Sequence, residues 1–261
     1  MRPTTFAFSC FLLMLISVIV PGPLAAQPAP LAETLLEIGL QSGTVEAPKT
    51  SRGPRVVFST MISDDDAAWI RLFFGEVVLA GKPAAGDGSF LRLTSQLDGV
   101  QQTLDSEELE SWSFSSAYFN GSKVLVEIVA FPGTGPNGVF IASAAIGSQF
   151  PRPLPDCGED DPRAASADPR IGRLLPVGCT AFLIDEDDCA NRFLTAGHCI
   201  GGSGVPVVQF NVPPSRTDGV IVHPPAEDQY PVDPGSLEAT DVGIGRDFAT
   251  FVVGLNSETG S

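Results

Sequence analysis

The amino-acid sequence predicts an all-β protein made of two successive β units. Short apolar runs alternate with stretches rich in glycine, proline, asparagine and aspartate, which is the pattern of strands and turns. A proline-rich, acidic stretch with almost no large apolar side chain, residues 151–170, divides these runs into two sets. We therefore expect a β-sandwich domain at residues 27–150, a linker at 151–170 and a second β domain at 171–261.

The first 26 residues have the pattern of an export signal peptide. Arg2 precedes an apolar run at residues 6–20, and a Pro-Gly-Pro sequence then leads to the small residues Ala25 and Ala26. The run has about 15 residues, whereas a spanning helix needs roughly 20. We expect a secreted protein, extracellular or periplasmic, that has no membrane contact after the signal is removed.

The sandwich domain is predicted from its apolar runs, with one short helix at residues 31–40 ahead of them. Residues 124–129 are rich in β-branched side chains and carry a single charge, which indicates a central strand. Residues 105–110 suit one helical turn. The expected strands are residues 56–62, 69–79, 90–95, 123–131 and 138–146.

The second unit repeats the pattern of short apolar runs and turns. Its predicted strands are residues 180–184, 192–196, 205–212, 219–222 and 248–253. The acidic run 185–188 separates the first two as a hairpin turn. This run and the run 64–66 suggest calcium ligands, but neither has the spacing of an EF-hand loop, so we interpret both as solvated turns. A calcium-dependent exported module remains a third hypothesis.

The charge and the cysteine pattern narrow the possible partners. A formal net charge of −16 disfavours binding to nucleic acid and to anionic membranes. The chain has no C-x-x-C pair and its two histidines are far apart in sequence, so we expect no zinc site, no other metal and no cofactor. After signal removal four cysteines remain, an even number that favours disulfides in an oxidising compartment. The composition gives no indication of an oligomeric state.

One histidine lies in a turn that a disulfide can hold in place. Cys179 and Cys199 come at the two outer ends of the predicted hairpin, so they should lie near each other. A bond between them closes a loop of about 20 residues, worth roughly 3 kcal/mol in the chain-entropy account. It would also fix the turn that carries His198, and a general base needs a fixed position of this kind.

The hairpin resembles a known family. Residues 195–199, Thr-Ala-Gly-His-Cys, are similar to the T-A-[AG]-H-C motif of trypsin-like (chymotrypsin-fold) serine proteases, and residues 178–184 are similar to the strand that precedes it. The resemblance implies that His198 is the general base and that the disulfide Cys179–Cys199 lies beside it. It further implies that residues 171–261 form the first β-barrel of such a protease and that the substrate is a protein or peptide.

The family also needs a carboxylate, later in the chain, that orients the imidazole. Asp247 opens an apolar run and resembles the aspartate of the family's D-[IWF]-A-[LV] segment, so the resemblance assigns it this role. Asp241, which also precedes an apolar pair, is the alternative. His223 stands before a proline where the family often has a surface histidine, and we interpret it as structural.

The resemblance is incomplete where the nucleophile is concerned. The family's serine lies in a G-D-S-G-G setting after the aspartate, and no such motif follows Asp247; Ser89 has similar neighbours in the wrong order. We therefore expect a secreted serine endopeptidase with a His-Asp-Ser triad, present here without its serine and inactive as written. The alternative is a non-catalytic exported binding or adhesion protein with a degenerate protease-like barrel.

Two further expectations concern the start of the barrel. Ile171 stands too near Cys179 for the family's usual leading strand, so we do not expect activation by cleavage before it. Cys157 and Cys189 are expected to bond to each other or to cysteines outside this chain.

Overall fold

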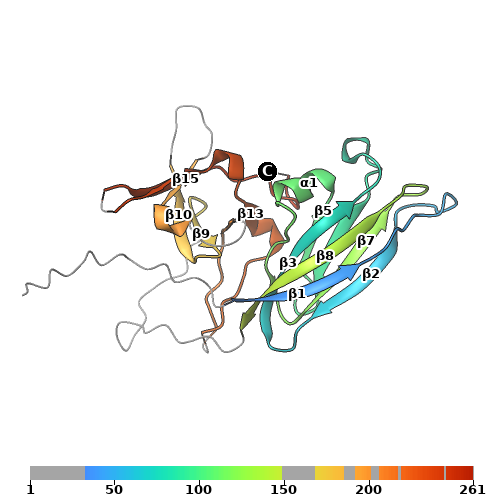
Figure 1. Ribbon diagram of the computed structural model, residues 1–261, viewed down its shortest axis with the longest axis horizontal. Coiled ribbons are helices and arrows are strands. Elements are labelled where there is room, and N and C mark those ends of the chain that lie inside the picture. The colour runs from blue at the N-terminus through green and yellow to red at the C-terminus, as the bar shows by residue number, and fades with distance from the viewer. Residues whose placement is uncertain are drawn as a thin grey trace, which may run out of the picture.

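A computed structural model describes residues 33–148, 168–184, 192–200, 206–216, 219–243 and 245–260. The fold is all-β, as predicted, with antiparallel strands in three sheets. Figure 1 shows these strands in two groups, one from blue to green and one in orange and red. The predicted signal peptide, nearly all of the linker, the acidic run 185–188, Cys157 and Cys189 lie outside the described residues.

The first group is a sandwich of two four-stranded sheets. One sheet has the order β1-β8-β3-β6 and the other the order β2-β7-β4-β5. The elements of this group are β1 (Glu33–Gln41), β2 (Arg55–Ser63), β3 (Ala67–Val78), η1 (Pro83–Ala85), β4 (Phe90–Ser95), β5 (Gln101–Leu104), α1 (Ser106–Ser111), β6 (Phe119–Asn120), β7 (Lys123–Ala130) and β8 (Gly138–Ser148).

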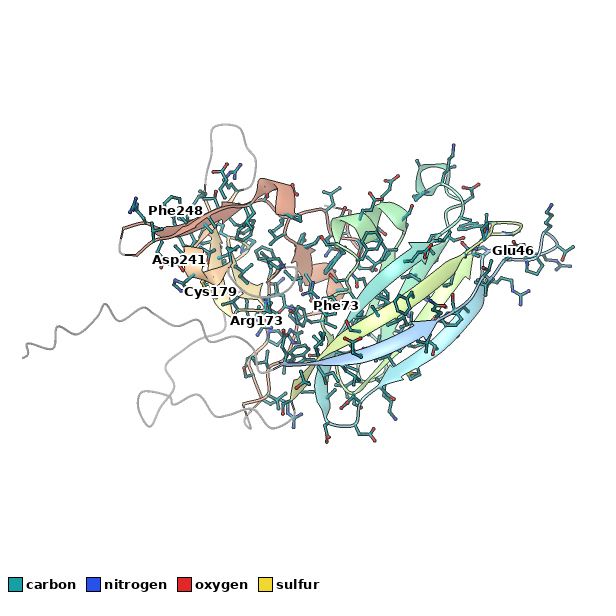
Figure 2. The ribbon with its side chains drawn as sticks, viewed as in Figure 1. Glu46, Phe73, Arg173, Cys179, Asp241 and Phe248 are labelled. Carbon is teal, nitrogen blue, oxygen red and sulfur yellow. A yellow bond between two sulfur atoms is a disulfide. The ribbon has the colours of Figure 1, made fainter. Side chains whose placement is uncertain are left out.

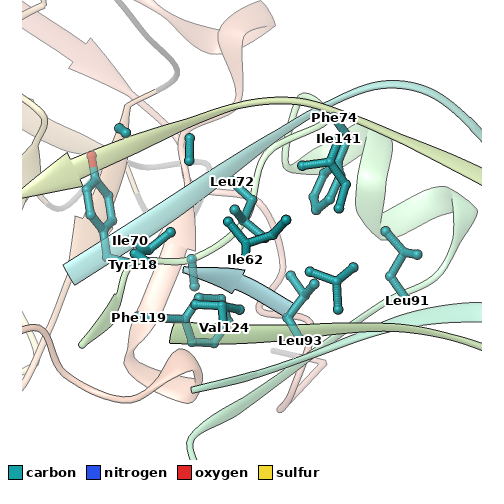
Figure 3. Close-up of a cluster of buried hydrophobic side chains, with 14 of the residues drawn as sticks. Ile62, Ile70, Leu72, Phe74, Leu91, Leu93, Tyr118, Phe119, Val124 and Ile141 are labelled. Atoms are coloured by element: carbon teal, nitrogen blue, oxygen red, sulfur yellow. The ribbon is translucent and has the colours of Figure 1, made fainter. Parts of the chain in front are cut away.

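The core of the sandwich lies between these two sheets. Ile62 and Leu93 come from one sheet, Leu72 and Ile141 from the other, and Figure 3 shows them in a single cluster. Strand β7 pairs with β2 on one side and β4 on the other, which confirms the prediction of a central strand at residues 124–129. Its alternate side chains are fully buried because successive residues of a strand point to opposite faces.

The predicted helix at residues 31–40 is wrong, whereas the predicted helical turn is present. Residues 33–41 form strand β1, which pairs antiparallel with β8. Leu36, Ile38 and Leu40 pack on the core at every second position, and this period of two outweighs the helix propensity of leucine and glutamate. Helix α1 begins after Asp105, whose side chain accepts from the backbone N–H groups of Glu107 and Glu108.

The second group is one seven-stranded sheet with the order β13-β12-β9-β10-β11-β15-β14. Val232 and Val253, which follow β13 and β15, form a bridge that joins the two sides of this sheet and makes it barrel-like. Its elements are β9 (Ile171–Leu175), β10 (Cys179–Leu183), β11 (Phe193–Thr195), η2 (Gly197–Cys199), β12 (Val207–Gln209), η3 (Ala226–Asp228), β13 (Gln229–Pro231), η4 (Pro234–Ser236), β14 (Glu238–Asp241) and β15 (Asp247–Phe251).

Two expectations for this unit are corrected by the structure. Residues 219–222 do not form a strand, whereas β13 and β14 are strands that were not predicted. Strand β9 begins at Ile171 and pairs with β10 through a tight turn, so the interval before Cys179 is long enough for a leading strand. His223, which we interpreted as structural, is buried with 2% of its surface exposed.

The barrel-like sheet packs against the sandwich. Leu175, Val207 and Ala226 belong to the same buried cluster as the sandwich core, whereas Leu174, Phe193 and Phe251 form a separate cluster inside the barrel. Within the described residues, no helix has the length and apolar character required to cross a membrane.

Candidate active site

The turn that carries His198 is fixed by the hairpin before it. Phe193 and Thr195 point into the barrel core from β11, and the Thr195 hydroxyl donates to the carbonyl of Thr180 at 2.9 Å. After β11 the chain enters the short 3-10 helix η2, whose middle residue is His198. The backbone that leads into His198 is therefore held against β10 on one side.

A disulfide between Cys179 and Cys199 holds the other side of this turn. Their Cα atoms are 6.0 Å apart, within the usual range for a bridged pair. This confirms the predicted pairing. The bond connects the start of β10 to the end of η2, and it leaves His198 directly beside it in sequence.

Asp247 contacts His198 at two points. One carboxylate oxygen, Oδ2, is 2.7 Å from the imidazole Nδ1, and the other, Oδ1, accepts the backbone N–H of His198 at 3.0 Å. Asp247 is the first residue of β15, and β15 pairs with β11, so the sheet itself places the carboxylate next to the turn. The side chains of His198 and Asp247 are 23% and 30% exposed.

The electrostatics of this pair define the tautomer of the ring. The hydrogen bond from the His198 backbone, followed by the one from its side chain, holds the pKa of Asp247 below its ordinary value. An ionised carboxylate only accepts hydrogen bonds, so Nδ1 of His198 is the donor. In the neutral ring Nε2 then carries the free lone pair and can accept a proton.

Asp241, the alternative carboxylate, lies opposite Asp247 on the neighbouring strand. Asp241 is exposed in β14. Among the described residues, the imidazole of His198 is hydrogen-bonded to Asp247. Figure 2 shows Cys179, Asp241 and Phe248 at the end of the barrel away from the sandwich.

Sequence reasoning missed the role of Gly197. A Cβ atom on this residue would lie 1.9 Å from the carbonyl oxygen of Thr240 and 3.1 Å from that of Phe248. Only glycine therefore allows η2 to rest on β14 and β15. The motif that residues 195–199 resemble accepts alanine or glycine at this position. The motif therefore does not predict that residue 197 must be glycine.

The site does not suit a metal ion while the disulfide is formed. Donor atoms of Cys179, His198 and Cys199 lie within 4.8 Å of one another. Both sulfur atoms are consumed in the bridge, however, and zinc binds thiolates. The acidic run at residues 64–66 behaves as a turn, since the Asp64 carboxylate accepts the backbone N–H of Asp66 at 3.0 Å.

The pair can act as a general base, but it needs a nucleophile. Within the described part of the chain, no hydroxyl group is hydrogen-bonded to Nε2 of His198. Ser89 is buried in the sandwich and its hydroxyl contacts Thr134 at 3.2 Å, so it is not available. The hydroxyl of Ser257 is 3.5 Å from the carboxylate of Glu258 instead.

Comparisons with protein-family models, with curated proteins and with solved structures found no match to this chain.

Proposed function

We propose that this chain carries the His-Asp half of a secreted serine endopeptidase of trypsin-like type. His198 is the general base, and Asp247 is the carboxylate that orients it. The observation that supports this proposal is the two-point contact of Asp247 with both the ring and the backbone of one histidine. The disulfide, which requires an oxidising environment, supports export.

The proposed chemistry follows from the tautomer. Nε2 of His198 takes the proton of a serine hydroxyl as that oxygen attacks the scissile carbonyl. Asp247 stabilises the imidazolium through its bond to Nδ1, and the imidazolium then gives the proton to the leaving amine. None of the serines in the 261 residues stands in a Gly-Asp-Ser-Gly-Gly setting. We therefore propose that these residues alone do not hydrolyse peptide bonds, because loss of a triad serine costs on the order of 10⁶ in rate.

The test is active-site labelling of the native secreted protein. A serine-directed fluorophosphonate should not label the 261 residues alone, whereas a secreted form that supplies a serine in a Gly-Asp-Ser-Gly-Gly setting should be labelled. In that form His198→Ala should abolish the labelling because the serine is no longer activated. Ser257→Ala, which changes a partly buried serine whose hydroxyl lies beside Glu258, serves as the matched control and should retain the label. Labelling that persists in His198→Ala would contradict the proposed role of this histidine.

A non-catalytic binding protein is the second candidate. Ile171 and Phe182 are paired across β9 and β10 and are 46% and 44% exposed, and Phe248 is 48% exposed. Apolar side chains exposed in this way are typical of surfaces that bind another protein. Absence of fluorophosphonate labelling from the folded native protein, whatever residue stands at 198, would favour this candidate over the protease.

A further inference from the structure

Two side-chain amides cross the junction between the sandwich and the barrel in opposite directions. Asn120 of β6 accepts the backbone N–H of His223 and donates to its carbonyl, both at 2.9 Å. Gln229 of β13 does the same for Tyr118, again at 2.9 Å for both bonds. Each amide satisfies both backbone groups of one residue in the other unit, as a neighbouring strand would. We call these four residues the amide clasp.

The aromatic rings at the clasp are also closely packed. His223 stacks on Tyr118 with ring centroids 4.7 Å apart and an interplanar angle of 22°. Trp69 meets both rings edge-on, each at 5.1 Å. Tyr118 and His223 are almost fully buried, so the stack excludes water from the hydrogen bonds beside it.

Further polar groups extend the clasp into the barrel. Gln209 of β12 donates to Gln229 at 2.9 Å, and Arg173 of β9 donates to Gln209 at 2.6 Å and to the carbonyl of Val222 at 3.0 Å. Arg173 is labelled in Figure 2 between the barrel site and the sandwich. Separating the two units would leave buried amides and backbone groups without partners, which is costly for each group.

The chain returns to the sandwich after the barrel. Asn256 donates to the carbonyls of Ala226 and Gln229, both at 2.8 Å, and the carboxylate of Glu258 accepts the backbone N–H of Thr103 in β5. Together with the shared apolar cluster, these contacts cover the same flank of the barrel that carries Gln229.

We propose that the β-sandwich is a scaffold for the barrel of its own chain. The surface of the sandwich around Tyr118 and Asn120 is occupied by the barrel, and the two units therefore unfold as one cooperative unit. The sandwich thus serves to hold the barrel folded through the clasp. This inference does not depend on the protease function.

The two units carry separate natural reporters. Both tryptophans, Trp69 and Trp112, belong to the sandwich, where Trp69 also contacts His223 of the barrel, whereas the disulfide Cys179–Cys199 lies in the barrel. In urea, tryptophan fluorescence follows the sandwich, and the rate at which a small thiol reduces this bridge, located by peptide mass mapping, follows the barrel. For the unaltered full chain we expect the two transitions to coincide. Transitions at clearly different urea concentrations would overturn the proposal without any variant.

Variants then test the clasp from both sides. Asn120→Leu in the sandwich should raise the rate of bridge reduction in the barrel about tenfold, the size expected when buried groups lose their partners. Gln229→Leu in the barrel should move the tryptophan transition to lower urea by a corresponding amount. The matched control is Gln96→Leu, because the exposed amide of Gln96 lies in the sandwich and makes none of the hydrogen bonds of the clasp. A bridge-reduction rate in Asn120→Leu equal to that of Gln96→Leu would reject the scaffold role.

Discussion

The position of His198 depends on the close approach of Gly197 to the neighbouring strands. Gly197→Ala would push η2 away from the carbonyl of Thr240, and the His198–Asp247 bond should lengthen or break with it. We expect a loss of about 1–3 kcal/mol of stability, typical of overpacking, and loss of the downfield NMR signal of the Nδ1 proton. Gly53→Ala, at a glycine with nothing within 4 Å of an added Cβ, is the control. A variant that keeps this signal would show that the contact is not essential.

The orientation of the imidazole can be tested separately from the packing. Asp247→Asn replaces the carboxylate with an amide that can donate to Nδ1, which favours the other tautomer of His198. Nitrogen NMR of the ring should then place the proton on Nε2. An unchanged tautomer would contradict the orienting role of Asp247.

At the residue scale, the sequence predicted the pair of His198 and Asp247 but not the buried contacts around His223. Residues 195–199 and Asp247 were identified because short motifs report local geometry, and the disulfide followed from the hairpin. The burial of His223 was missed because it depends on Trp69 and Tyr118, which are distant in sequence and belong to the other unit.

Among the elements, α1 provides a carboxylate with a measurable pH effect. Burial raises the pKa of Glu108 to about 7, and its side chain also accepts the backbone N–H of Asp105. A carboxylate whose pKa is raised on folding contributes stability that is complete below about pH 4.5 and is lost as pH rises through about 7. Glu108→Gln keeps the hydrogen-bond acceptor without the charge.

We therefore expect Glu108→Gln to be more stable than the unaltered chain at pH 8 and equal to it at pH 4. The full shift converts to about 3 kcal/mol, and solvent screening of this half-exposed side chain reduces the gain to about 1 kcal/mol. Urea unfolding at the two pH values measures it. Glu107→Gln, at an exposed neighbour in the same helix, is the control and should show no comparable gain at pH 8.

The elements were predictable wherever their pattern was unambiguous. Strand β4 and most of β7 and β8 were expected within a residue or two, because apolar runs there are bounded by turn residues. The error at β1 arose because leucine and glutamate favour a helix in isolation. Pairing with β8 decides the outcome, and that partner is about a hundred residues away along the chain.

For the whole molecule, His223 should make the junction sensitive to acid. Burial, and then the nearby Arg173 and Arg71, hold the pKa of His223 well below 6.5. Below about pH 6.5 His223 binds a proton in the unfolded chain but not in the folded chain. The free energy of unfolding therefore falls as pH falls, by up to roughly 1.4 kcal/mol per pH unit. His223→Phe keeps the stacked ring and removes the titration.

The measurement is the free energy of unfolding between pH 5 and pH 6.5. His223→Phe should show a smaller loss across this interval than the unaltered chain, whatever its absolute stability. Glu108 and Glu258, whose pKa values are raised by burial, act in the opposite direction in both proteins and cancel in the comparison. Equal slopes in the two proteins would exclude His223 as the cause.

The sequence predicted the all-β class of the molecule but not the way its two units meet. Gln229 and Asn120 are polar residues in short strands, and nothing in their neighbours indicates that they satisfy backbone groups of another unit. The barrel-like closure through Val232 and Val253 is similarly a long-range property.

The contrast between the two histidines has a practical consequence for chemical modification. His198 is partly open to solvent with a free lone pair on Nε2, whereas His223 is sealed in the junction. An acylating reagent such as diethyl pyrocarbonate should therefore modify one imidazole per folded chain and both in urea. Modification of the second imidazole would then measure the fraction of molecules in which the barrel and the sandwich have separated.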